Sequence, residues 1–150
     1  MAYIQLSDIG ITGVVTAVPK NKINNNDLTT EFGEKHIHKF IKTTGVQTRR
    51  VAAEHQTAAD LGVAAAYELL QQKGISQEEI GALVFASHGP DYKRPATAHV
   101  LQKRLCLPEH CACFDISLGC SAFVYGTQIL GGLMQTSDIQ KALLIVGDTN

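Results

Sequence analysis

Short apolar runs alternate with segments of helical character along the chain. Ala82–Ala86 and Ala142–Val146 are entirely apolar, which is typical of strands covered on both faces. Ala112–Ile116 and Ile9–Val18 are also rich in apolar residues, and both are predicted to be strands. Ile9–Val18 is expected to be the first buried strand, ending at Pro19.

Helix signals occupy the intervals between these runs. Thr57 is expected to cap a helix, with Asp60 as the acidic partner of a capping box and Gly74 as its left-handed end. Two further helices are expected, over Thr97–Cys106 and Cys120–Gln135. The core-facing stripe of the Thr57 helix is predicted at i, i+3, i+7 and i+11, namely Ala58, Leu61, Ala65 and Leu69.

The segment between the first strand and the Thr57 helix is more polar. Asn21–Asn26 predicts a turn, Asp27–Lys42 predicts two short helices separated at Gly33, and Gly45–Ala52 predicts an edge strand. The alternation of strands and helices along the whole chain predicts an α/β layered fold. Its central sheet is expected to be mostly parallel, with helices on both faces.

Composition narrows the class of protein. The 150 residues carry a formal charge of -1, which argues against nucleic-acid binding. The apolar stretches are about five residues long, and a membrane helix needs about 20. The N-terminus lacks the pattern of a secretory signal, so we expect a cytoplasmic chain with reduced cysteines. Length alone favours one domain.

Cys120 is the candidate nucleophile. The stretch Phe114–Phe123 runs from a predicted strand through Gly119 into a predicted helix, so Cys120 should lie at the helix N-terminus. The partial positive charge there stabilises a thiolate, and the free N–H groups can hold an oxyanion formed when sulfur attacks an acyl carbonyl. The alternative is that Cys120 is a small buried apolar residue, as most cysteines are.

Other candidate groups are weaker. The spacing of Cys106, Cys111 and Cys113 beside His110 does not match paired C-x-x-C zinc sites, so no metal is expected. His88 follows a strand and is the internal candidate for a general base, with a solvated loop histidine as the alternative.

The glycine pattern does not favour binding of a nucleotide cofactor. Gly10 and Gly13 form only G-x-x-G, and the sequence contains no phosphate-loop motif. No cofactor is therefore expected.

Several motifs together resemble the β-ketoacyl-[acyl carrier protein] synthase III family of the thiolase-like superfamily. Asp115–Phe123 resembles the nucleophile segment of that family. The remaining similarities follow in the family's order: Ile9–Gly13 with Val18-Pro19, Asn26–Leu28, Thr44–Val46 with Arg49-Arg50, Thr57–Gly74, Ala86–Pro95 and Ala142–Asp148. The resemblance implies a thiolase-like fold, with residues 1–150 as the N-terminal half of a duplicated architecture.

The resemblance also implies an activity in fatty acid biosynthesis. Cys120 would take an acyl group from acyl-CoA or another acyl thioester, and malonyl-[acyl carrier protein] would then lose CO₂ and attack the acyl-cysteine. The family's His and Asn partners come from the second half, beyond Asn150, so we expect these residues alone to be inactive. His88 is not at a family catalytic position.

Two places depart from the family pattern. Lys39 and Thr43 stand where the family often has the Trp and Arg that hold the adenine end of CoA. Arg94 stands where an aromatic residue commonly precedes the loop proline. The acyl primer and its donor are therefore left open.

Two alternatives to this activity remain. One is another thiolase-superfamily acyltransferase, similar to hydroxymethylglutaryl-CoA synthase, and the other is a non-catalytic dimerising interaction module. The resemblance implies a homodimer formed through an edge strand, for which Ala112–Ser117 is the apolar candidate. An isolated half would also expose the apolar face that packs on its second half.

Overall fold

A computed structural model describes residues 5–149, which fall into two compact units. The larger unit comprises residues 5–17 and 57–149, and the smaller unit is Val18–Gln56. Each unit has its own sheet.

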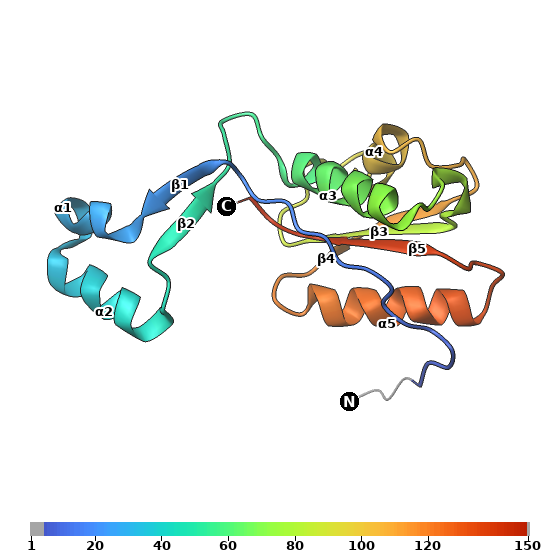
Figure 1. Ribbon diagram of the computed structural model, residues 1–150, viewed down its shortest axis with the longest axis horizontal. Coiled ribbons are helices and arrows are strands. Elements are labelled where there is room, and N and C mark those ends of the chain that lie inside the picture. The colour runs from blue at the N-terminus through green and yellow to red at the C-terminus, as the bar shows by residue number, and fades with distance from the viewer. Residues whose placement is uncertain (1–4, 150) are drawn as a thin grey trace. The chain divides into compact units, whose positions relative to one another are not determined.

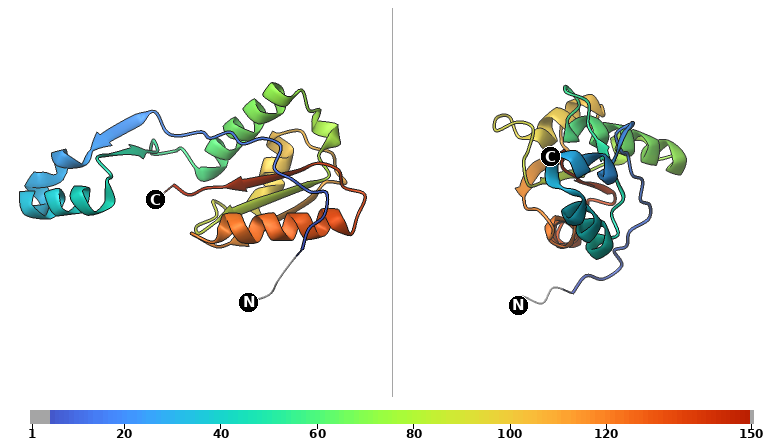
Figure 2. Two further views of the ribbon diagram at one scale, coloured as in Figure 1. Left: turned by 60° about the horizontal axis from the view of Figure 1, so that its bottom comes forward. Right: turned by 90° about the vertical axis from the view of Figure 1, so that its left-hand side faces the viewer.

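The larger unit contains a parallel three-stranded sheet in the order β4-β3-β5. Its strands are β3 (Ala82–Ser87), β4 (Ala112–Ser117) and β5 (Ala142–Val146). Two helices, α3 (Ala58–Lys73) and α4 (Thr97–Arg104), cover one face, and α5 (Ala122–Gln135) covers the other (Figures 1 and 2). The short 3-10 helix η2 (Gln77–Glu79) precedes β3. This arrangement confirms the predicted α/β fold with a parallel sheet between helices.

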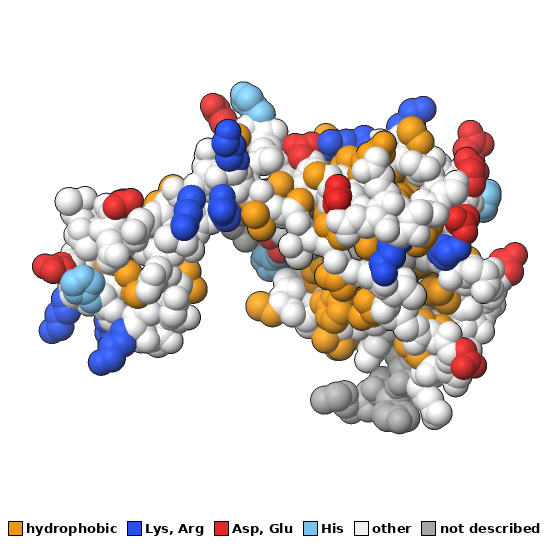
Figure 3. Space-filling model, viewed as in Figure 1, with side chains coloured by type: hydrophobic (Ala, Val, Ile, Leu, Met, Phe, Trp, Pro, Cys, Tyr) orange, Lys and Arg blue, Asp and Glu red, His pale blue; other side chains and the backbone are white. Residues whose placement is uncertain are grey.

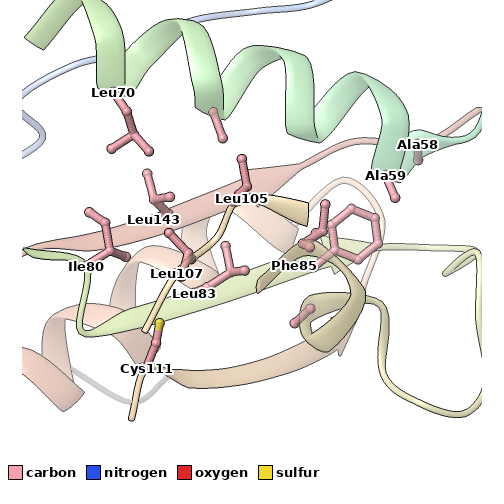
Figure 4. Packing of buried hydrophobic residues seen from close by; sticks show 13 residues of the cluster. Ala58, Ala59, Leu70, Ile80, Leu83, Phe85, Leu105, Leu107, Cys111 and Leu143 are labelled. Atoms are coloured by element: carbon pink, nitrogen blue, oxygen red, sulfur yellow. The ribbon is translucent and has the colours of Figure 1, made fainter. Parts of the chain in front are cut away.

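The core is divided by β3, which is buried on both faces. Leu83 and Phe85 point toward α3 and α4, whereas Ala82 and Val84 pack with Leu130 of α5. Figure 4 shows the buried residues on the α3 and α4 side of the sheet, with Leu70 of α3 above the sheet. An all-apolar run forms this strand because neither face is left to solvent.

Carboxylates secure the helix starts on the α3 and α4 side. Thr57 and Asp60 form the predicted capping box, and Gly74 ends α3 in the left-handed conformation, with φ 62°. The Asp91 carboxylate accepts from the Ala59 N–H at 2.8 Å. From β4, Asp115 accepts from two backbone N–H groups at the start of α4, both at 2.7 Å; these belong to Thr97 and Ala98.

The smaller unit pairs β1 (Asn21–Asn24) with β2 (Thr48–Val51) in antiparallel register. Between them lie η1 (Asn25–Leu28), α1 (Thr29–Phe32) and α2 (Glu34–Thr44). Gly33, at φ 83°, separates the two helices, as predicted. Asn25, the first residue of η1, is buried and links η1 to β2 and the residues before it. Its amide donates to the Val46 carbonyl, and its oxygen accepts from Arg49 Nε.

Two predictions for the N-terminal part of the chain were wrong. Ile9–Val18 forms no strand, and Ile11, Val14 and Val18 are all more than 60% exposed. Within residues 5–149 no strand pairs with this segment, and it lies against α3 instead: a Cβ built on Gly13 would lie 2.7 Å from Leu69 Cδ1. Asn21–Asn24 is a strand rather than a turn, because both faces of a two-stranded ribbon are exposed and need no apolar side chains.

Two helix details also differ from expectation. The buried stripe of α3 is shifted by one residue, with Leu61, Ala65 and Leu69 only half-buried. The buried residues Ala58, Gly62, Ala66 and Leu70 form an i, i+4 row beside the sheet, and Ala59 is buried next to its first member. Small residues occupy this row because α3 packs closely, and a Cβ on Gly62 would lie 2.8 Å from Ile145 Cγ2. The helix expected from Cys120 begins at Ala122.

The Asp115 contact predicts a measurable contribution to stability. Asp115→Ala leaves two helix N–H groups without their acceptor and should lower the free energy of unfolding by about 2–3 kcal/mol. Urea denaturation measures this difference, with Asp138→Ala, an exposed turn residue, as the control. Equal losses in the two variants would contradict the capping role.

Candidate active site

The carboxyl ends of the three parallel strands meet at one edge of the sheet. Ser87 of β3 lies opposite Ser117 of β4, and Ala86 lies opposite Val146 of β5. The segments that leave these strands therefore begin side by side, which is where open α/β sheets bind ligands. Three polar or reactive side chains follow directly: His88, Cys120 and Asp148.

Cys120 lies in the turn between β4 and α5, two residues before the first helical residue. The turn is closed by a hydrogen bond from the Ala122 N–H to the Gly119 carbonyl, at 2.9 Å. Its thiol is free and exposed, so the alternative of a buried apolar cysteine is wrong.

The start of α5 differs from the starts of α3 and α4. Ser121 is the N-cap of α5, and no side chain makes a cap hydrogen bond there. In contrast, α3 receives the capping box and Asp91, and α4 receives Asp115. Within residues 5–149 no side-chain oxygen caps α5, so the partial positive charge of its N-terminus lies beside the Cys120 turn, which the Ala122 N–H closes.

The remaining cysteines have different environments. Burial raises the pKa of the Cys111 thiol, and burial together with Cys111 raises the pKa of Cys113 to about 12. Their sulfur atoms are 3.8 Å apart, and both stay protonated within the core. Cys106 is exposed at the end of α4. In the described part of the chain, no group of three or more His, Cys, Asp or Glu side chains is placed to hold a metal.

The sequence reasoning did not identify Asp148 as a site residue. Its Oδ1 accepts three hydrogen bonds from the end of β3: the Ser87 hydroxyl at 2.6 Å, and the N–H groups of His88 at 2.8 Å and Gly89 at 3.2 Å. Burial alone raises the pKa of Asp148, but these bonds and the nearby His88 outweigh it and lower that pKa below its ordinary value. The signal available beforehand was the position, directly after a strand parallel to β3.

His88 lies beside the Cys120 turn, as expected from the strand ends. A Cβ built on Gly119 would lie 3.5 Å from His88 Nδ1, so the imidazole ring is the neighbour on the open side of Gly119. The ring makes no hydrogen bond to the Cys120 thiol within residues 5–149, and His88 is exposed. The site thus brings together a presented thiol and a histidine anchored through its backbone.

The three positions that depart from the family pattern are all exposed. Lys39 and Thr43 lie on α2 in the smaller unit, and Arg94 lies in the loop before α4. None of the helices described is long and apolar enough to cross a membrane.

Known proteins share this fold and between 25% and 39% of the aligned residues. The β-ketoacyl-[acyl-carrier-protein] synthase III of Symbiobacterium thermophilum is 34% identical over 95% of this chain and 42% of that protein. The crystal structure of a 3-oxoacyl-(acyl-carrier protein) synthase from Burkholderia xenovorans is 39% identical, with a TM-score of 0.88 over 91% of this chain and 39% of that chain. A variant of Xanthomonas campestris OleA is 25% identical, with a TM-score of 0.85. No protein-family model matches.

The sheet and its flanking helices thus define one half of a thiolase-like α/β fold. The chain is a homologue of the β-ketoacyl-[acyl-carrier-protein] synthase III family, matching a partial, N-terminal-like domain. It spans about 40% of the length of the relatives it matches.

The Asp148 contacts predict a pH-dependent contribution to stability. Because folding lowers the pKa of Asp148, the stabilisation is fully present above the ordinary value of 3.8 and is lost as pH falls through the lower folded value. Asp148→Asn keeps an acceptor oxygen but cannot ionise. The gap in thermal midpoint between wild type and Asp148→Asn should therefore narrow between about pH 6 and about pH 3. A gap that stays constant over this range would contradict the assignment.

Proposed function

We propose that the protein carrying this segment is a decarboxylating condensing enzyme of the β-ketoacyl synthase III type, with Cys120 as its nucleophile. The observation that carries the proposal is the exposed thiol at an α5 N-terminus without a side-chain cap. Homology to condensing enzymes supports the reaction class.

The chemistry begins with an acyl transfer. The Cys120 thiolate attacks the carbonyl carbon of an acyl thioester, such as acyl-CoA, and the resulting oxyanion draws on amide donors near the start of α5. The oxyanion collapses, the donor's thiolate leaves and is protonated, and an acyl-cysteine remains.

Condensation then lengthens the acyl chain. Malonyl-[acyl carrier protein] loses CO₂, and its carbanion attacks the acyl carbon on Cys120. The Cys120 thiolate leaves, and the product is a β-ketoacyl thioester. By resemblance, a His and an Asn outside these 150 residues assist the decarboxylation.

Acyl-enzyme formation tests the role of Cys120. In a full-length form, Cys120→Ala should abolish the mass increase seen after incubation with acyl thioesters, because it removes the thiol of this turn and a serine hydroxyl is a much weaker nucleophile. Cys106→Ala, which removes the other exposed thiol, is the matched control and should acylate normally. Acylation that persists in Cys120→Ala would show that another residue is the nucleophile.

A panel of donors addresses the substrate. Acyl-CoA and acyl-[acyl carrier protein] should be compared, because Lys39 and Thr43 alter the family's CoA pattern. Products formed from malonyl-carrier rather than from a second acetyl thioester separate decarboxylative condensation from a hydroxymethylglutaryl-CoA synthase-like reaction.

We also propose that the chain associates as a homodimer. β4 is an edge strand of its sheet, so its outer backbone groups are open to a further strand. A second apolar surface lies over α5, where large side chains are 41–55% exposed (Figure 3); they are Phe123, Val124, Tyr125 and Ile129. By resemblance, this α5 surface packs on the second half of the fold.

Light scattering tests the association. We expect a dimer through the open edge of β4, and larger species at high protein concentration, since the exposed apolar patch over α5 also favours association. The double variant Phe123→Ser, Ile129→Ser makes the α5 surface more polar and should leave pairing through β4 intact. A monomeric wild type would contradict the proposal, and a monomeric double variant would contradict the assignment of the interface to β4.

A further inference from the structure

The hydrogen bonds to Asp148 reach beyond the end of the β3–β5 pairing. The backbone pairing of these strands already closes with the Gly147 N–H donating to the Ala86 carbonyl, at 3.2 Å. Asp148 instead binds the next three residues, Ser87 to Gly89, where the chain leaves the sheet. Its carboxylate therefore fixes the first residues of the loop after β3.

Ser87 makes this contact specific. Its side chain is 1% exposed, and its hydroxyl donates to Asp148 Oδ1. A buried hydroxyl that loses its acceptor is destabilising, so an acceptor oxygen at residue 148 favours one placement of the residues that leave β3. The two N–H bonds then orient the backbone from which the His88 side chain projects.

The placement of the His88 ring affects the turn that carries Cys120. His88 is the nearest side chain on the open side of Gly119, the residue before Cys120: a Cβ built on Gly119 would lie 3.5 Å from His88 Nδ1 and 3.9 Å from His88 Cγ. Displacement of the loop after β3 would remove the ring from one side of that turn, and a turn lacking packing on one side samples more conformations.

We propose that Asp148 is a positioning residue for Cys120: its Oδ1 holds the end of β3 so that His88 packs on Gly119 and fixes the turn that presents the thiol. This inference rests on the proposed role of Cys120 as nucleophile. Asp148 acts through His88 and donates nothing to the reacting atoms.

Site-resolved alkylation tests the proposal on the chain itself. The rate of iodoacetamide modification is measured at Cys120 and, as an internal reference, at Cys106, which is also exposed. Asp148→Ala should lower the Cys120 rate relative to the Cys106 rate by about tenfold, the lower end of the effect seen when a residue that orients a metal ligand is removed. Asp148→Asn, which retains an acceptor oxygen, should restore most of the rate.

Two further variants separate positioning from general stability. Glu79→Ala removes a different carboxylate, which pairs with Lys141 before β5, and should leave the ratio of the two rates unchanged. His88→Ala should lower the Cys120 rate as much as Asp148→Ala does. The double variant at Asp148 and His88 should react no more slowly than either single variant, because Asp148 acts on Cys120 through His88.

The outcomes distinguish this proposal from the one on which it rests. A wild-type Cys120 that reacts no faster than Cys106 would contradict the nucleophile assignment. A reactive wild-type Cys120 with an unchanged ratio in Asp148→Ala would overturn only the positioning role. If Glu79→Ala also lowers the ratio of the Cys120 rate to the Cys106 rate, the effect arises from general destabilisation. That result would also overturn the positioning role.

Discussion

Burial of β3 on both faces is the constraint on which the larger unit depends. Ala82 to Ser87 are at most 1% exposed, so the strand requires a neighbour on each edge and helices above and below. Parallel neighbours need crossover connections, and α4 and α5 lie in these connections. As a result, the carboxyl ends of β3, β4 and β5 share one edge, and the segments that carry His88, Cys120 and Asp148 start together.

The helices around this sheet differ in whether a carboxylate caps their first turn. Asp91 and Asp115 neutralise the starts of α3 and α4, and Arg104 of α4 pairs with Asp60 of α3 at 2.8 Å. The start of α5 receives no side-chain cap within the described residues, and the exposed Cys120 thiol lies two residues before it. A helix start without a cap is a site where negative charge is stabilised, which suits a thiolate or the oxyanion of an acyl-transfer step.

Much of the fold could be predicted because local signals and tertiary packing agree. The apolar runs at β3 and β5, the capping box at Thr57 and Gly74 each specify one structure, and the structure confirms all of them. Ile9–Val18 was predicted incorrectly because an apolar, extended segment becomes a strand only where a partner is available. Asn21–Asn24 was missed because its pairing uses only the backbone and leaves no periodicity in the side chains.

Only part of the candidate site could be predicted, because only some of its residues carry a local signal in the sequence. Cys120 could be found because a strand, a glycine and a helix start adjoin in sequence, and His88 because it follows a buried strand. Asp148 also follows a buried strand, but its role could not be predicted, since its three donors lie about 60 residues earlier and meet it only when β3 and β5 pair. One measurement tests the central claim most directly: the rate of Cys120 alkylation near neutral pH against that of a small model thiol. A thiol presented at an open helix start should react faster than the model compound. A rate equal to or below that of the model thiol would contradict this role for Cys120.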